Sequence, residues 1–162
     1  MTPISDFIQQ HNMVSIAPTV TITATPDYSA GDCVGGIVTV SSAVNTKSNR
    51  PIRLTNVTLT DNAGQAPALS LLFFRATPAG GTYTDNSALV LDASDIADLV
   101  GVVRIAAADW YTVSSKSLVA VNDLNMIMDI TTTSLFMLVV ADGAYNAGAT
   151  TDLTVKLGVD QF

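Results

Sequence analysis

The sequence predicts an all-β domain, a jelly-roll-like antiparallel β-sandwich or barrel with an N-terminal arm and one short helix. Three observations lead to this prediction. Apolar runs of strand length recur along the chain, separated by turn residues roughly every eight to twelve positions. Thr and Val, which favour strands, are abundant. All 14 acidic residues are Asp, which favours turns and helix caps over helix interiors, so long helices are not expected.

Residues 1–18 differ from the rest of the chain and are expected to form the arm, which leaves residues 19–162 as the sandwich domain. A short helical turn in the arm would present Ile4, Phe7 and Ile8 together. These three side chains are the candidate partner-binding residues. Either a neighbouring subunit or the domain's own surface would hold them.

The first strand of the domain is expected over residues 19–25, where apolar residues alternate with Thr. The apolar residues of this strand are Val20, Ile22 and Ala24. Turn residues follow, and residues 33–41 form the second expected strand. Its Gly35-Gly36 pair predicts a bulge or a close backbone approach.

The third expected strand, residues 51–60, changes its apolar parity midway and so predicts a bulge near Thr55-Asn56. Residues 61–64 are turn formers, and we expect a hairpin turn there. Residues 67–75 are apolar almost throughout and include two adjacent Phe residues. This run predicts either a strand covered on both faces or an aromatic pair at an interface, and the sequence leaves both open.

A Gly- and Thr-rich loop over residues 77–86 and a short strand over 88–91 come next. The only internal helix is expected over residues 92–99, with Asp92 or Ser94 as its cap. The remaining strands are expected at residues 100–106, 118–121, 127–131, 135–141 and 153–159.

Groups suited to catalysis are sparse, and we expect a protein that is not an enzyme. The only histidine, His11, lies in the arm, away from any nucleophile motif. The only cysteine, Cys33, precedes Val34 and is expected to be a buried small hydrophobe. A sandwich hydrolase that brings two of the Asp carboxylates together stays a third possibility, although nothing in the sequence singles out a pair.

Cofactors and metals are not expected either. No nucleotide-binding, zinc-binding or phosphate-binding motif occurs in the sequence. Asp92, Asp95 and Asp98 are spaced by three, but side chains on a helix diverge, whereas a calcium ion needs oxygen ligands that converge. We therefore expect these residues to form an acidic, solvent-facing helix side and a cap.

The net charge of −7 and the scattered basic residues exclude nucleic acid as an expected partner, because phosphate contacts require clustered Lys and Arg. Lys47, Arg50 and Arg53 do lie close together, and we expect them in a solvated loop that leads into a strand. No apolar run reaches membrane-spanning length, and the N-terminus lacks the pattern of a secretory signal. We therefore expect a protein made in the cytoplasm and without a membrane partner.

A binding module, such as a phage tail or fibre domain or a lectin-like sandwich, is the alternative function. It would use the loops at residues 77–86, 107–115 and 143–150 for recognition of a surface glycan or protein. The aromatic residues near these loops are the weak candidates for a sugar platform. They are Tyr83, Trp110, Tyr111 and Tyr145.

Four short segments carry a resemblance to a known family. They are DYSAGDCVGG at residues 27–36, TDNSA at 84–88, VGVV at 100–103 and DLTV at 152–155. With these segments, residues 19–162 resemble a family of small virion proteins of tailed bacteriophages.

The resemblance implies a head decoration, or cement, protein that binds the outside of the assembled capsid and stabilises the shell through contacts between subunits. The implied partners are the major capsid protein and further copies of the chain, often in a homotrimer. The implied location is the capsid exterior of the virion. The family supplies no catalytic residues to carry over.

Overall fold

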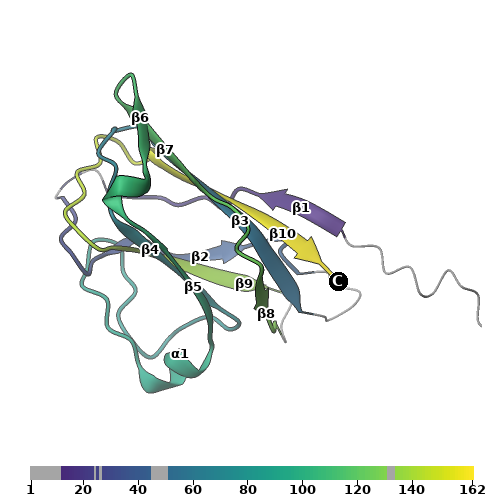
Figure 1. The fold of residues 1–162 in the computed structure, drawn as a ribbon. Helices are drawn as coiled ribbons and strands as arrows, with labels where there is room; N and C mark the ends of the chain where they lie inside the picture. Colours follow the sequence, from purple (N-terminus) through teal and green to yellow (C-terminus); the bar gives the residue numbers. More distant parts are fainter. Residues whose placement is uncertain (1–11, 24, 26, 45–50, 131–133) are drawn as a thin grey trace, which may run out of the picture.

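The chain folds into a β-sandwich of two antiparallel sheets (Figure 1). The computed structural model describes residues 12–162 except residues 24, 26, 45–50 and 131–133. Within this described part, no helix is long and apolar enough to cross a membrane. The six-stranded sheet has the order β1-β10-β3-β7-β6, with β8 also paired to β3, and the four-stranded sheet has the order β2-β9-β4-β5.

The strands of the six-stranded sheet are β1 (Asn12–Ile16), β3 (Ile52–Asp61), β6 (Tyr111–Val113), β7 (Lys116–Val121), β8 (Met126–Met128) and β10 (Leu153–Gln161). Those of the four-stranded sheet are β2 (Cys33–Val40), β4 (Leu69–Phe74), β5 (Leu99–Ile105) and β9 (Leu135–Ala141). The chain passes repeatedly between the sheets, and β1-β10-β3-β7 faces β2-β9-β4-β5. This strand order is that of a jelly roll, and the predicted fold class is confirmed.

The central strand β4 shows how the interior is filled. All six of its residues are buried, so it is covered on both faces, and the first of the two alternatives for this run is confirmed. Leu71 and Phe73 pack in the core between the sheets. Leu72 and Phe74 point the other way, into a second apolar cluster on the outer side of the four-stranded sheet.

Both predicted bulges are present. Gly35 and Gly36 have φ values of 79° and 67°, and the pairing of β2 with β9 shifts its register between Val34 and Ile37. In β3, Asn56 pairs with Gly158 and Leu54 pairs with Val159, which leaves Thr55 as the extra residue. The bulge therefore lies where the parity change along β3 predicted it, near Thr55-Asn56.

Three expected elements differ in the structure. Residues 19–23 keep the alternation, with Val20 and Ile22 buried, but they pair with no strand, and Ala24 lies outside the described residues. Residues 61–64 turn the chain but form no hairpin, because β3 and β4 belong to different sheets. Residues 88–91 form only isolated bridges, Asp32 with Ala88 and Thr82 with Val90.

The segment expected to be an arm is described only from residue 12 onwards. Asn12–Ile16 form β1, which pairs with the C-terminal half of β10 at the edge of the six-stranded sheet. The sequence did not predict this strand or β6. Six residues that carry predictions from the sequence lie outside the described part of the chain: Ile4, Phe7, Ile8, His11, Lys47 and Arg50.

Candidate functional site

The outer faces of the two sheets differ, and this difference defines the candidate site. The outer face of the four-stranded sheet is covered by residues 77–92 and by helix α1 (Ala93–Ala97). Tyr83, Leu89 and Leu91 of this cover pack with Leu72 and Phe74 of β4. The cover buries most of this face, and the large apolar residues that stay exposed on it are Val90, Ile96 and Val102.

A buried carboxylate holds the cover in place. Asp95 accepts hydrogen bonds from the backbone N–H of Ala79 and Gly80, each at 2.9 Å, and from the hydroxyl of Tyr83. The expected acidic solvent face is therefore wrong for Asp95, because the loop before the helix folds over it. Asp92 caps α1 as predicted, with its carboxylate accepting from the backbone N–H of Ser94 at 2.9 Å.

These bonds make the cover sensitive to pH. The hydrogen bond from Tyr83, helped by the backbone N–H groups of Ala79 and Gly80, holds the pKa of Asp95 below its usual value. Burial and the bond to Asp95 raise the pKa of Tyr83 to about 12. The folded state thus favours an ionised Asp95 and a neutral Tyr83.

We expect the protein to lose stability in acid partly through Asp95. A carboxyl with a lowered pKa contributes its full stabilisation above its unfolded pKa, near 3.9, and loses it as the pH falls through the folded value. Urea unfolding from pH 7 down to pH 2 should show this loss, and Asp95→Asn should be less stable at pH 7 and flatter below about pH 4. If the free energy of unfolding fell equally with pH in both proteins, the loss could not be assigned to Asp95.

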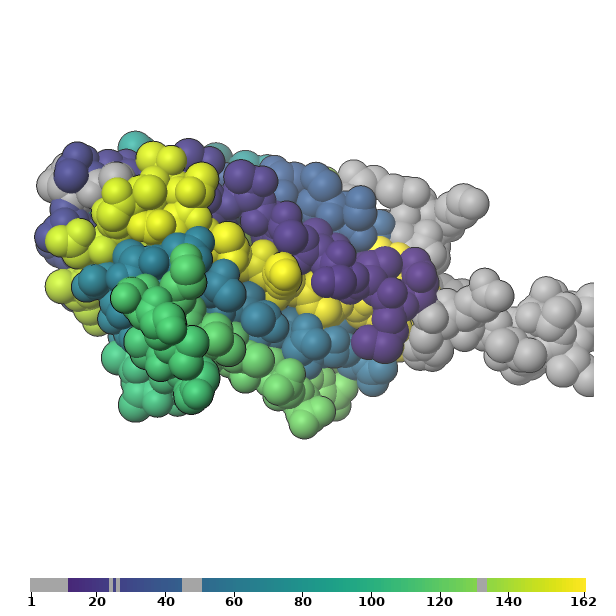
Figure 2. Space-filling model, turned by 90° about the horizontal axis from the view of Figure 1, so that it is seen from above, coloured from purple at the N-terminus to yellow at the C-terminus, as the bar shows by residue number. Residues whose placement is uncertain are grey.

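The outer face of the six-stranded sheet is uncovered by the described part of the chain, and we call it the open face (Figure 2). Residues paired directly across antiparallel strands point to the same side, so the registers define rows across this face. The open face comprises Met13, Ser15, Arg53, Asn56, Thr58, Thr60, Tyr111, Val113, Lys116, Leu118, Ala120, Ile127, Thr154, Lys156, Gly158 and Asp160.

The middle of the open face is flat because its side chains are small. One row runs from Lys156 on β10 through Thr58 on β3 to Ala120 on β7. The next row contains Gly158 and Asn56. Lys156 is the only long side chain in these rows, and its flexible stem can lie along an apolar partner surface.

One end of the open face carries three exposed apolar side chains and one charged residue, Lys116, which pairs with Val113. Tyr111 on β6 pairs with Leu118 on β7, and Val113 follows on the same side of β6. Tyr111 is 65% exposed, Val113 46% and Leu118 42%. Aromatic and aliphatic side chains exposed this far are groups that gain most from burial against a partner.

The other end of the open face combines an ion pair with two exposed apolar residues. Arg53 on β3 bonds to the carboxylate of Asp160 on β10, and its guanidinium lies 5.7 Å from the centre of the Phe162 ring. Met13 and Ile127 stand on either side of this pair in the same row and are 67% and 64% exposed. Arg53 was expected with Lys47 and Arg50 in a loop that leads into a strand. It is the one of the three that the structure describes, and it lies in β3 itself.

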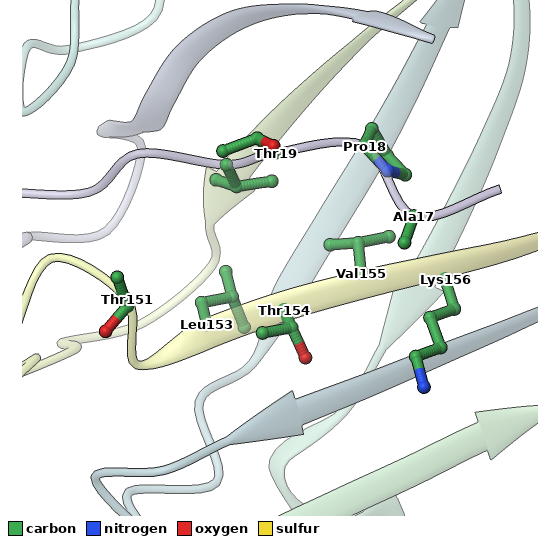
Figure 3. Close-up of a pocket in the computed structure, with 9 residues that line it drawn as sticks. Ala17, Pro18, Thr19, Thr151, Leu153, Thr154, Val155 and Lys156 are labelled. Carbon is green, nitrogen blue, oxygen red and sulfur yellow. The ribbon is translucent and has the colours of Figure 1, made fainter. Parts of the chain in front are cut away.

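Two hollows adjoin the open face. A groove of about 420 Å³ separates residues 17–20 from the first half of β10 (Figure 3). A second hollow, of about 500 Å³, is lined by Arg53, Thr55, Asp123 and Asn125. Asp123 and Asn125 both have positive φ, 57° and 45°, so this loop is tightly turned.

Three of the four aromatic candidates for a sugar platform are structural, and that expectation is wrong for them. Tyr145 is fully buried and stacks on Tyr28 with ring centres 5.8 Å apart. Trp110 is buried, and its indole N–H donates to the carbonyl oxygen of Pro67 at 2.8 Å. Tyr83 is buried and belongs to the cover described above. Only Tyr111 is exposed, and it is on the open face.

The remaining candidate residues also have internal partners. Cys33 is buried as predicted, and burial raises the pKa of its thiol to about 11. Asp85, in the loop at residues 77–86, accepts from the Tyr28 hydroxyl at 2.7 Å and from the Gly35 backbone N–H at 2.6 Å. Asp98 pairs with Arg75 at 2.9 Å. Among the described residues, no three His, Cys, Asp or Glu residues converge to hold a metal ion.

Comparison with known proteins adds no relative to this picture. The chain matches no family model and no curated protein.

Proposed function

We propose that this domain is a phage head decoration protein that attaches its open face to the outside of the capsid and stabilises the shell. The observation that carries the proposal is the asymmetry of the sandwich, in which residues 77–97 cover one sheet and no described residue covers the other. The likeness of four short segments to tailed-phage virion proteins supplies the choice of partner, the major capsid protein.

The size of the open face suits such a contact. Its sixteen positions, each about 6.6 Å along a strand and about 4.8 Å across strands, cover roughly 500 Å². A specific interface of standard size uses about 800 Å² from each partner. The open face therefore provides most of a standard interface without any rearrangement of the fold.

The distribution of side chains on the open face also supports docking. The flat Thr- and Gly-rich centre allows close approach, and the exposed apolar groups at both ends provide anchors. A shell gains stability when a protein binds only the assembled form, because the bound state is favoured by mass action. In this role the domain needs no catalytic group, and we expect no enzymatic activity.

Charge placed on the open face should abolish binding to capsids. Thr58→Arg and Ala120→Arg introduce two charges in the centre of the face, where docking would bury them without partners. We expect affinity to fall by more than about 30-fold, since a buried unpaired charge at an interface costs about 2 to 5 kcal/mol. The measurement is co-sedimentation of purified protein with capsids assembled from the major capsid protein of the same genome.

The matched control places the same charges on the covered side. Ala93 and Ala97 are exposed on α1, so Ala93→Arg and Ala97→Arg should bind capsids like the unmodified protein. If both double variants bound equally well, the open face would not be the docking surface. If the unmodified protein did not bind capsids at all, the proposed function would be wrong.

A further inference from the structure

The groove beside β10 exists because two segments of the chain separate and rejoin. The pairing of β1 with β10 ends at Ile16 and Leu157. The next backbone bond between the two segments is from the N–H of Ile22 to the carbonyl oxygen of Thr150, at 3.3 Å. Pro18 lies between these points and has no N–H to donate, so the ladder cannot continue through it. The groove lies between these two contacts.

The groove is lined mainly by apolar residues. Its lining comprises Ala17, Pro18, Thr19, Val20, Thr151, Leu153, Thr154, Val155 and Lys156. Figure 3 shows Leu153 and Val155 on the side of β10 that faces residues 17–19, with Thr154 and Lys156 on the other side. Val20, Leu153 and Val155 form a buried apolar floor, and the space of about 420 Å³ above them has room for one or two large side chains.

We propose that this groove receives Phe7 and Ile8 from residues 1–11 of a second copy of the chain. The inference deepens the proposed function and rests on it, because it names how neighbouring decoration proteins hold one another. Residues 1–11 provide apolar groups of suitable size, and Phe7 and Ile8 are adjacent. Burying an aromatic and a branched aliphatic side chain is the usual way in which short segments gain affinity.

The reach of the chain argues for a second copy as the donor. Phe7 lies five residues before Asn12 and extends at most about 17 Å from it. Ala17, the near end of the groove, lies about 17 Å from Asn12 in the opposite direction, because strand β1 occupies most of that distance. A reversal of the chain uses at least about two residues, so Phe7 and Ile8 of the same chain fall short.

Charge also matches between the two parts. Lys156 is the only charged side chain that lines the groove. Asp6 is the only carboxylate side chain in residues 1–11, and it precedes Phe7. With Phe7 in the groove, Asp6 would lie at the rim near Lys156. A contact of this kind, from one copy to a different site on the next, forms a ring such as a trimer when the rotation between copies closes.

Cross-linking of mixed full-length chains tests the proposal. One chain carries Gln9→Cys, which leaves Phe7 and Ile8 in place, and the other carries Thr19→Cys in the exposed part of the groove lining. Cys33 is fully buried and does not compete. A short bifunctional thiol reagent should join the two chains about tenfold more efficiently than it joins Gln9→Cys to Ala107→Cys, an exposed control site, because docking raises the local concentration. Adding Phe7→Ala to the Gln9→Cys chain should abolish the difference.

Each other outcome has a definite meaning. Cross-linking only when both cysteines are on one chain would overturn the proposal, because the chain's own arm would then fill the groove. Equal yields at Thr19 and Ala107 across a concentration series and on capsids would also overturn it. Capsid binding without the specific cross-link would leave the proposed function standing and remove this inference. The specific cross-link without capsid binding would remove the proposed function and leave the contact between copies standing.

Discussion

Replacing Asp61 by alanine is expected to lower the free energy of unfolding by about 3 to 5 kcal/mol. Asp61 ends β3 and is fully buried. Its carboxylate accepts from the backbone N–H groups of Ala63, Gln65 and Ala66 at 3.0, 2.6 and 3.1 Å and from the Tyr145 hydroxyl at 3.2 Å. Alanine leaves all four donors without an acceptor in a turn that joins the two sheets.

The loss should be visible as a shift in the urea midpoint with little change in slope. Asp61→Asn keeps the shape and one acceptor oxygen, so it should destabilise less than alanine. Asp129→Ala, at an exposed aspartate, is the matched control and should change stability by less than about 0.5 kcal/mol. If Asp61→Ala were as mild as that control, the carboxylate would not be what holds the turn.

Replacing Gly81 by alanine is expected to disrupt the cover of the four-stranded sheet and to cost about 3 kcal/mol or more. A Cβ at this position would lie 1.8 Å from the carbonyl oxygen of Val90 and 2.6 Å from the hydroxyl of Tyr83. The carbonyl belongs to the backbone and accepts from the Thr82 N–H at 2.9 Å, so it cannot move away cheaply. The loop has to separate from residues 88–91.

The damage should be local to the covered side. Hydrogen exchange should speed up for Thr82 and Val90 before it does for the strands of the six-stranded sheet. Gly143→Ala is the control, because a Cβ there meets no atom within 4 Å and its expected effect is below about 0.5 kcal/mol. Uniform acceleration of exchange across both sheets would show that the cover is not a separate unit.

Most strands could be predicted because their apolar residues either alternate with polar ones or run without a break over several positions. The parity change between Ile52 and Leu59 located the bulge of β3, since a single inserted residue moves all later side chains to the other face. The same signal was insufficient at residues 19–23. Val20 and Ile22 do point into the core, but alternation reports which side is buried and not whether a neighbouring strand is within bonding distance.

The hairpin of β6 and β7 was missed for a chemical reason. Ser114 and Ser115 both have positive φ, 49° and 65°, as a tight two-residue hairpin turn requires. That geometry is usually signalled by Asn-Gly or Asp-Gly, and Ser-Ser carries no such signal. The tip of the hairpin is instead braced from outside, where the carbonyl oxygen of Ser115 approaches Gly64 so closely that a Cβ would lie 2.5 Å from it.

The candidate site itself could not be predicted, because it depends on which sheet the loops cover. The spacing of Asp92, Asp95 and Asp98 indicated a helix side but gave no sign that residues 79–80 would fold onto Asp95. Likewise, the exposed residues of the open face come from strands far apart in the sequence. Their row becomes visible only when the registers of β10, β3 and β7 are known.

The single covered sheet also gives the domain a fixed polarity for display. Anything attached through the bare sheet would carry α1 and the loop at residues 77–92 on its distant side (Figure 1). A fluorescent label attached through Ala93→Cys, at an exposed position of α1, would then project into solvent from a decorated particle. The same label attached through Ser114→Cys, at the turn between β6 and β7, would lie beside the support and hinder loading.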